Sequence, residues 1–117
     1  MGRQVKVEEV VFKNKDDRNM VTTTQLRLLL SNSVVVKNKI EMVCKKGDKL
    51  PAEIQNEIKY LLIKHIYQCG RDAKVRDFDK AFHIADVIKD IGDSQEKFNE
   101  YYRYLEEIVA YVKYYKG

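Results

Sequence analysis

His65 and Cys69 have the types and spacing best suited to chemistry, because they stand four positions apart in an apolar stretch. On a helix this spacing places both side chains on one face, where an imidazole nitrogen and a thiolate can bind one metal ion. The chain has two histidines and two cysteines in all, and no carboxylate-rich set stands beside this pair. We therefore interpret both as core residues, and we expect no metal site and no cofactor.

Other candidate catalytic groups lack the partners that a reaction requires. No base is suggested for Cys44, and His83 stands between apolar neighbours. Asp77 and Asp79 fall on different faces of a helix and make a poor acid–base pair. The sequence has neither a phosphate-binding glycine loop nor a zinc-protease motif. It therefore favours a protein without catalytic activity and without a small-molecule substrate.

Positive charge forms a more informative pattern. Lys64 and Arg71 are seven residues apart and align along one helix face, and Lys74 and Arg76 follow shortly after. Arginine binds phosphate through two hydrogen bonds and lysine adds a point charge, so this stripe suits a sugar–phosphate backbone. On composition alone, ordinary solvated helix faces explain the same charges. The candidate binding residues, with Lys37 and Lys39 as the weaker ones, are Arg27, Lys37, Lys39, Lys64, Arg71, Lys74 and Arg76.

The helices that must position these residues follow from the apolar periodicity. We expect helices from Thr22 to about Gly47, from Pro51 to Gly70, from about Lys74 to Ile91 and from Ser94 to Lys116. A capping box begins the first at Thr22, with Gln25 reaching back. Pro51 suits the first position of the second. In that second helix the additional apolar residues predict burial on two sides; they are Tyr60, Ile63, Ile66 and Tyr67.

The last helix is the expected scaffold of the fold. Its apolar residues recur at three- and four-residue steps from Phe98 to Val112, and no Pro or Gly interrupts it. Six of the chain's eight tyrosines lie between Tyr101 and Tyr115. Stacking with nucleic-acid bases is possible for them, but core packing or a protein–protein seam is the favoured interpretation. A helical adaptor that dimerises through this helix is therefore the alternative to a nucleic-acid-binding protein.

Length and composition limit the number of domains, the fold class and the cellular setting. The 117 residues fit one domain, 44% of them hydrophobic and 34% charged, with a net charge of +4. We expect residues 1–21 to form an arm or a short helix, and residues 22–117 to form an all-α, compact helical bundle of four main helices. No apolar run approaches the roughly 18 residues of a membrane span, and no signal peptide is recognisable. Two cysteines make a disulfide framework implausible, which favours a cytoplasmic setting.

Three stretches resemble one known family. They are Thr22–Ser31 (TTTQLRLLLS), Ile66–Asp72 (IYQCGRD) followed by Val75–Phe78 (VRDF), and Phe98–Tyr115. In order and spacing they are similar to the small subunit of the type III-A CRISPR effector, the Csm complex. Glu107 stands where that family usually has alanine, and residues 1–21 lie outside the resemblance.

The resemblance implies a compact helical bundle that has no catalytic activity of its own. Such subunits assemble in a few copies along the crRNA-containing filament, where they contact the target RNA and the other Csm subunits. It therefore implies crRNA, target RNA and other Csm subunits, including further copies of this chain, as partners in antiviral defence, and no membrane. Arg27 and Arg71 lie inside the matching motifs and rank highest as RNA-binding residues. The small subunit of the type III-B effector is a rival, but the quoted motifs match it less well.

Overall fold

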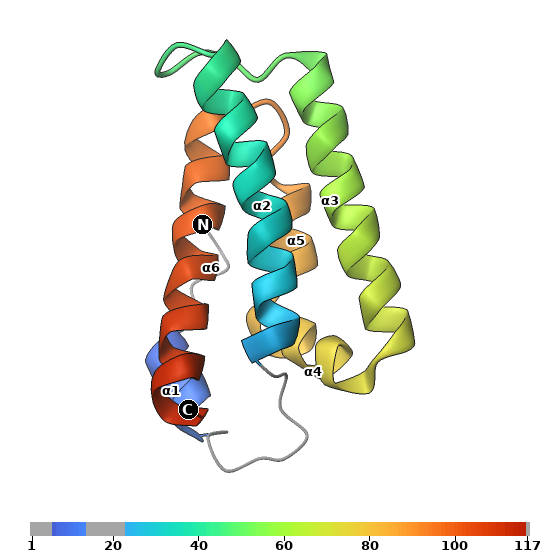
Figure 1. The fold of residues 1–117 in the computed structure, drawn as a ribbon, viewed down its shortest axis with the longest axis vertical. Helices are drawn as coiled ribbons and strands as arrows, with labels where there is room; N and C mark the ends of the chain where they lie inside the picture. Colours follow the sequence, from blue (N-terminus) through green and yellow to red (C-terminus); the bar gives the residue numbers. More distant parts are fainter. Residues whose placement is uncertain (1–5, 14–22, 117) are drawn as a thin grey trace.

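The computed structural model describes residues 6–13 and 23–116, and in that part every regular element is a helix. The long helices α2, α3 and α6 run side by side along the long axis of the molecule (Figure 1). The predicted all-α, compact fold is confirmed. The helices are α1 (Val7–Lys13), α2 (Thr23–Val43), α3 (Ala52–Arg71), α4 (Ala73–Phe82), α5 (Ile84–Lys89) and α6 (Gln95–Lys116).

The α6 helix is the centre of the core, as its periodicity predicts. Five of its side chains are fully buried and recur at three- and four-residue steps: Phe98, Tyr101, Leu105, Ile108 and Val112. The helix packs against α1, α2 and α5. The buried Tyr101 hydroxyl lies 2.7 Å from the Ser33 hydroxyl of α2, which in turn donates to the Leu29 carbonyl at 2.9 Å. Burial raises the pKa of Tyr101, so its phenol stays protonated and bonded.

The N-terminal segment contributes a short helix to the same core. Val7 and Val11 of α1 are buried among the core residues, and α1 packs against α6 near the end of the chain (Figure 1). Of the two conformations expected for this segment, helix is therefore the one observed over Val7–Lys13. The division of the chain at residue 21 stays a prediction. The capping box assigned to Thr22 lies outside the described residues.

The expected single helix from Lys74 to Ile91 is wrong, because the chain breaks at His83 into α4 and α5. His83 has a φ of 58°, in the left-handed region. One tertiary and one local hydrogen bond hold the break: the Tyr104 hydroxyl donates to the Phe82 carbonyl at 2.9 Å, and the Ala85 amide donates to Asp79 Oδ1 at 2.8 Å. Since no Gly or Pro marks the position, the local sequence gives no sign of it.

We expect His83→Gly to raise the free energy of unfolding by about 0.5–1 kcal/mol. A left-handed residue with a Cβ costs about 1–2 kcal/mol, and the extra entropy of glycine in the unfolded chain cancels part of the gain. Urea denaturation would measure the change. His83→Ala keeps the Cβ and is the control. An equal effect of the two substitutions would show that the left-handed conformation is not the source of the gain.

The junctions between the long helices differ slightly from the expected boundaries. Helix α2 ends at Val43, and Gly47, with a φ of 88°, lies in the turn that follows. Pro51 is the residue before α3 and not its first helical residue. No described helix combines the length and the apolar character that a membrane crossing requires.

Candidate nucleic-acid interface

The corner between α3 and α4 is built around Asp72. This residue ends α3 and caps α4, because its Oδ1 accepts the Lys74 amide at 2.9 Å. Its Oδ2 accepts a hydrogen bond from the side-chain amide of Gln25, near the start of α2. One carboxylate thus joins three helices, and it fixes the corner relative to the start of α2.

Four of the predicted binding residues lie at this corner or on the adjoining turns of α3. Lys64, Arg71 and Arg76 are exposed, and Lys74 is half-buried. Arg76 Nε donates to the Cys69 carbonyl at 3.1 Å, which directs its side chain back along α3. The Arg71 guanidinium lies 5.5 Å from the centre of the Tyr67 ring. Within residues 6–13 and 23–116, none of the four takes part in an ion pair.

Arg27 reaches the surface from the start of α2, two residues after the Gln25 that bonds to Asp72. The start of α2 and α4 lie at the same end of the molecule (Figure 1). Arg27 is therefore placed at the same end as the α3–α4 corner.

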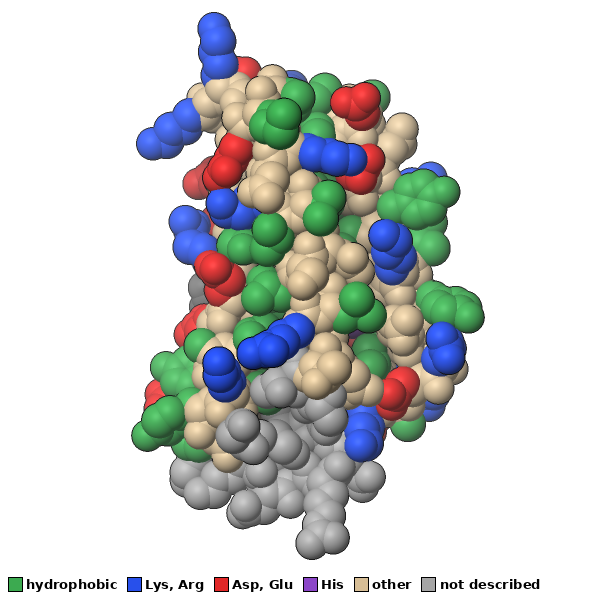
Figure 2. Space-filling view, viewed as in Figure 1, with side chains coloured by type: hydrophobic (Ala, Val, Ile, Leu, Met, Phe, Trp, Pro, Cys, Tyr) green, Lys and Arg blue, Asp and Glu red, His purple; other side chains and the backbone are tan. Residues whose placement is uncertain are grey.

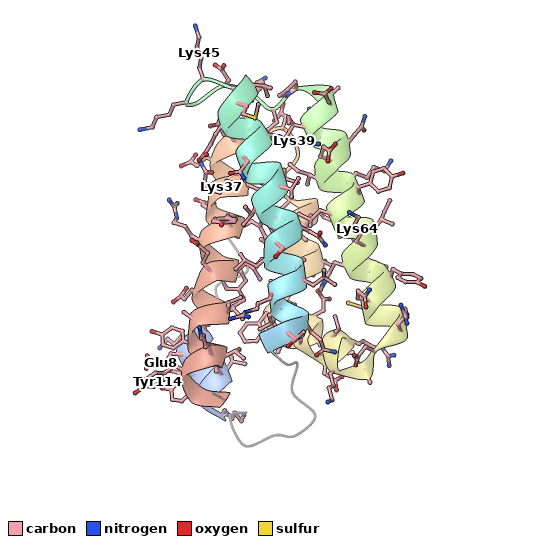
Figure 3. All side chains as sticks on the ribbon, viewed as in Figure 1. Glu8, Lys37, Lys39, Lys45, Lys64 and Tyr114 are labelled. Carbon is pink, nitrogen blue, oxygen red and sulfur yellow. The ribbon has the colours of Figure 1, made fainter. Side chains whose placement is uncertain are left out.

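Lys37 and Lys39 lie apart from this corner, farther along α2 (Figure 3). Lys37 Nζ pairs with Glu41 at 2.7 Å, and Lys39 Nζ pairs with Glu57 of α3 at 2.9 Å. The hydrogen bond that Lys37 donates to Glu41 raises the pKa of Lys37. Because each ammonium already has a carboxylate partner, these two residues are weaker candidates for phosphate binding. The role of all seven candidate residues stays a prediction.

The outer face of α3 is not buried on a second side as the sequence predicts. Tyr60 and Tyr67 are 65% and 61% exposed, and Ile63 and Ile66 are exposed as well. Figure 2 shows hydrophobic side chains along the outer edge of α3, interspersed with Lys and Arg. Residue type identifies these positions as apolar, but it does not say whether another helix covers them. The structure leaves α3 with one buried face and one exposed face that is both aromatic and basic.

His65 is buried, as predicted, and its hydrogen-bond partner, Asp79, is not one that the sequence suggested. His65 Nε2 lies 2.8 Å from Asp79 Oδ1 on α4, and Cys69 Sγ lies 3.6 Å from the same nitrogen. The donor atoms of the three residues lie within 4.8 Å of one another. Such atoms suit zinc, yet Asp79 Oδ1 also accepts the Ala85 amide. The arrangement is that of a hydrogen-bonded pair that joins α3 to α4 and to the start of α5.

The pKa directions agree with this structural role. Burial by itself raises the pKa of Asp79, but hydrogen bonds from His65 and from the Ala85 amide hold it below the ordinary value. Burial, followed by the negative charge of Asp79, raises the pKa of the Cys69 thiol. A raised thiol pKa disfavours the thiolate, so Cys69 is poorly suited to act as a nucleophile.

A cavity of about 330 Å³ lies between α2, α3 and α4, next to the candidate interface. Leu29 and Phe78 are among its buried lining residues, whereas Leu28, Lys64 and Tyr67 are exposed at its mouth. Lys64 lies on α3 beside α2 (Figure 3). The cavity therefore opens to the surface beside one of the predicted phosphate-binding residues.

Comparison with known proteins gives a consistent result. A family model described as Csm2 Type III-A matches residues 4–117, which includes N-terminal residues that the sequence resemblance left out. A "CRISPR system Cms protein Csm2" of Mycobacterium tuberculosis is 31% identical over 112 residues, 94% of this chain and 89% of the relative. A protein of Streptococcus thermophilus with the same description is 34% identical, over 90% of this chain and 81% of the relative. Another, of Enterococcus italicus, is 30% identical, over 95% of this chain and 85% of the relative.

Proposed function

The chain belongs to the Csm2 Type III-A family of CRISPR proteins, and from this premise we propose that it is a non-catalytic, RNA-binding small subunit of the effector complex. It binds the sugar–phosphate backbone of the crRNA and the target RNA in the cytoplasm. Its protein partners are the other Csm subunits, including further copies of itself. Its role is to hold RNA in an assembly used for antiviral defence, and the catalysis belongs to other subunits.

The observation that supports this proposal is the group of exposed cations around the α3–α4 corner. Lys64 and Arg71 have no carboxylate partner among the described residues, and the sequence between Ile58 and Arg71 contains no acidic residue. A surface with unpaired cations gains from phosphate contacts without first breaking ion pairs. Because phosphates carry no sequence information, binding through this surface is independent of RNA sequence.

The adaptor alternative has less support. Among the tyrosines of α6, all of which the structure describes, Tyr114 is the exposed one at 79%, whereas Tyr101 is buried and the others are partly buried. The Tyr104 hydroxyl is already bonded to the Phe82 carbonyl. A dimer seam along α6 would therefore have few tyrosines available to it.

Removing two of the exposed cations tests the proposal. We expect Lys64→Ala with Arg71→Ala to weaken the binding of single-stranded RNA about tenfold at low salt. The slope of log affinity against log salt should fall by about 1.4, since each lost phosphate contact contributes about 0.7 for single strands. Fluorescence anisotropy with a labelled RNA would measure both. The melting temperature should hardly change, because both side chains are exposed.

The matched control removes the same charge from another surface. Arg103 and Lys113 are exposed on α6, so Arg103→Ala with Lys113→Ala also lowers the net charge by two. This variant should keep most of the RNA affinity. If both double variants lost affinity equally, net charge and not the α3–α4 corner would determine binding, and the site assignment would be wrong.

A further inference from the structure

The cavity between α2, α3 and α4 has walls of two chemical kinds. Leu29 and Phe78 give it apolar surfaces, and Tyr67, which is 61% exposed on α3, lines its edge. The half-buried side chains of Asn32 and Gln68 also line it, and each amide carries both hydrogen-bond donors and an acceptor. Its volume of about 330 Å³ lies at the lower end of the range for small-ligand sites. The cavity therefore suits a small, flat ligand with apolar faces and polar edges.

Cations and one hydrogen-bonded carboxylate lie around the cavity, because the lining residue Gln25 bonds to Asp72. Lys64 lines the cavity, and the Arg71 guanidinium lies 5.5 Å from the centre of the Tyr67 ring. No acidic residue occurs on α3 between Ile58 and Arg71. A ligand that enters here thus places an attached anionic group next to Lys64 and Arg71.

We propose that this cavity binds one unstacked nucleobase of an RNA strand whose phosphates are held by Lys64 and Arg71. The base stacks on Tyr67, and the amides of Asn32 and Gln68 bond to its edges. The inference rests on the proposed function and adds a base contact to its backbone contacts. A nucleobase is the occupant that matches apolar walls, amide groups and a cationic mouth together, because single-stranded RNA presents stackable rings joined by phosphates. An apolar side chain of a protein partner would use neither the amides nor the charge.

The test compares intact and base-free RNA on the full chain. The probes are a labelled single-stranded oligouridylate and a ribose–phosphate strand of the same length that is abasic at every position. We expect Tyr67→Ala to weaken oligouridylate binding about tenfold, as for the loss of one stacked base, and to leave the binding of the abasic strand unchanged. Tyr60→Ala is the matched control, because Tyr60 is equally exposed on α3, seven residues earlier, and does not line the cavity.

A second variant tests the hydrogen-bonding wall. Asn32→Ala should also weaken binding of oligouridylate and not of the abasic strand.

If the wild-type chain binds both strands equally with a salt dependence, the base site is wrong while the proposed backbone binding stands. If the chain binds neither strand, both proposals fail. If Tyr67→Ala weakens association with other Csm subunits but leaves oligouridylate binding unchanged, the cavity is a protein-binding groove and the inference is overturned.

Discussion

Leu105→Ala is expected to lower the free energy of unfolding by about 3–4 kcal/mol, because a buried leucine loses its apolar contacts and leaves a cavity behind. Leu105 is fully buried near the middle of α6, the helix that packs against α1, α2 and α5. The surrounding helices cannot move in to fill this cavity without losing their contacts with one another. A domain of this size is stable by about 5–15 kcal/mol in all, so the loss is a large fraction of the total.

Urea denaturation followed by circular dichroism would measure the loss, with Glu107→Ala as the control. Glu107 is exposed on the same helix, and alanine is a good helix former, so its substitution should change stability by about 0.5 kcal/mol or less. A loss below about 1 kcal/mol for Leu105→Ala would contradict the central position of α6 in the core.

The α6 helix could be predicted from sequence because its signal is local and long. Its apolar residues keep the helical period over several turns, and no helix-breaking residue interrupts them. The break at His83 could not be predicted, since one of the bonds that hold it comes from a distant helix and the other forms only in the broken conformation. Tyr104 on α6 binds the Phe82 carbonyl across 22 positions of sequence, and Asp79 binds the Ala85 amide only once the chain has turned.

For the candidate interface, too, the sequence predicted local features but not those that depend on how the helices pack. The spacing of Lys64 and Arg71 predicts a shared face, and both are exposed on α3. The pairing of Lys37 with Glu41 is a four-residue helical spacing and could have been foreseen. The pairing of Lys39 with Glu57 depends on how α2 and α3 pack, and so does the exposure of Tyr60. Spacing thus assigns residues to a helix face, whereas packing decides which faces and charges are left for a partner.

Asp79→Ala is expected to lower the free energy of unfolding by about 2–4 kcal/mol. The substitution removes the acceptor of the Ala85 amide at the start of α5, a capping bond of about 1 kcal/mol. It also removes the partner of the buried His65 Nε2 at 2.8 Å and leaves this nitrogen only the weak Cys69 thiol contact, and a poorly satisfied buried polar group costs about 1–3 kcal/mol. Asp79→Asn keeps a side-chain oxygen in place and should cost about 1 kcal/mol at neutral pH.

The stability difference between the wild type and Asp79→Asn should depend on pH, and its sign follows from the carboxylate. Hydrogen bonds from His65 and the Ala85 amide, acting against burial, hold the folded pKa of Asp79 below its ordinary value of 3.8. The ionised carboxylate therefore adds stability that is complete above that value and is lost as the pH falls through the lower folded pKa. Urea denaturation from neutral pH down to about pH 3 should show the two proteins converging in acid. A difference that stayed constant over this range would mean that the charge of Asp79 adds nothing to the bonds joining α3, α4 and α5.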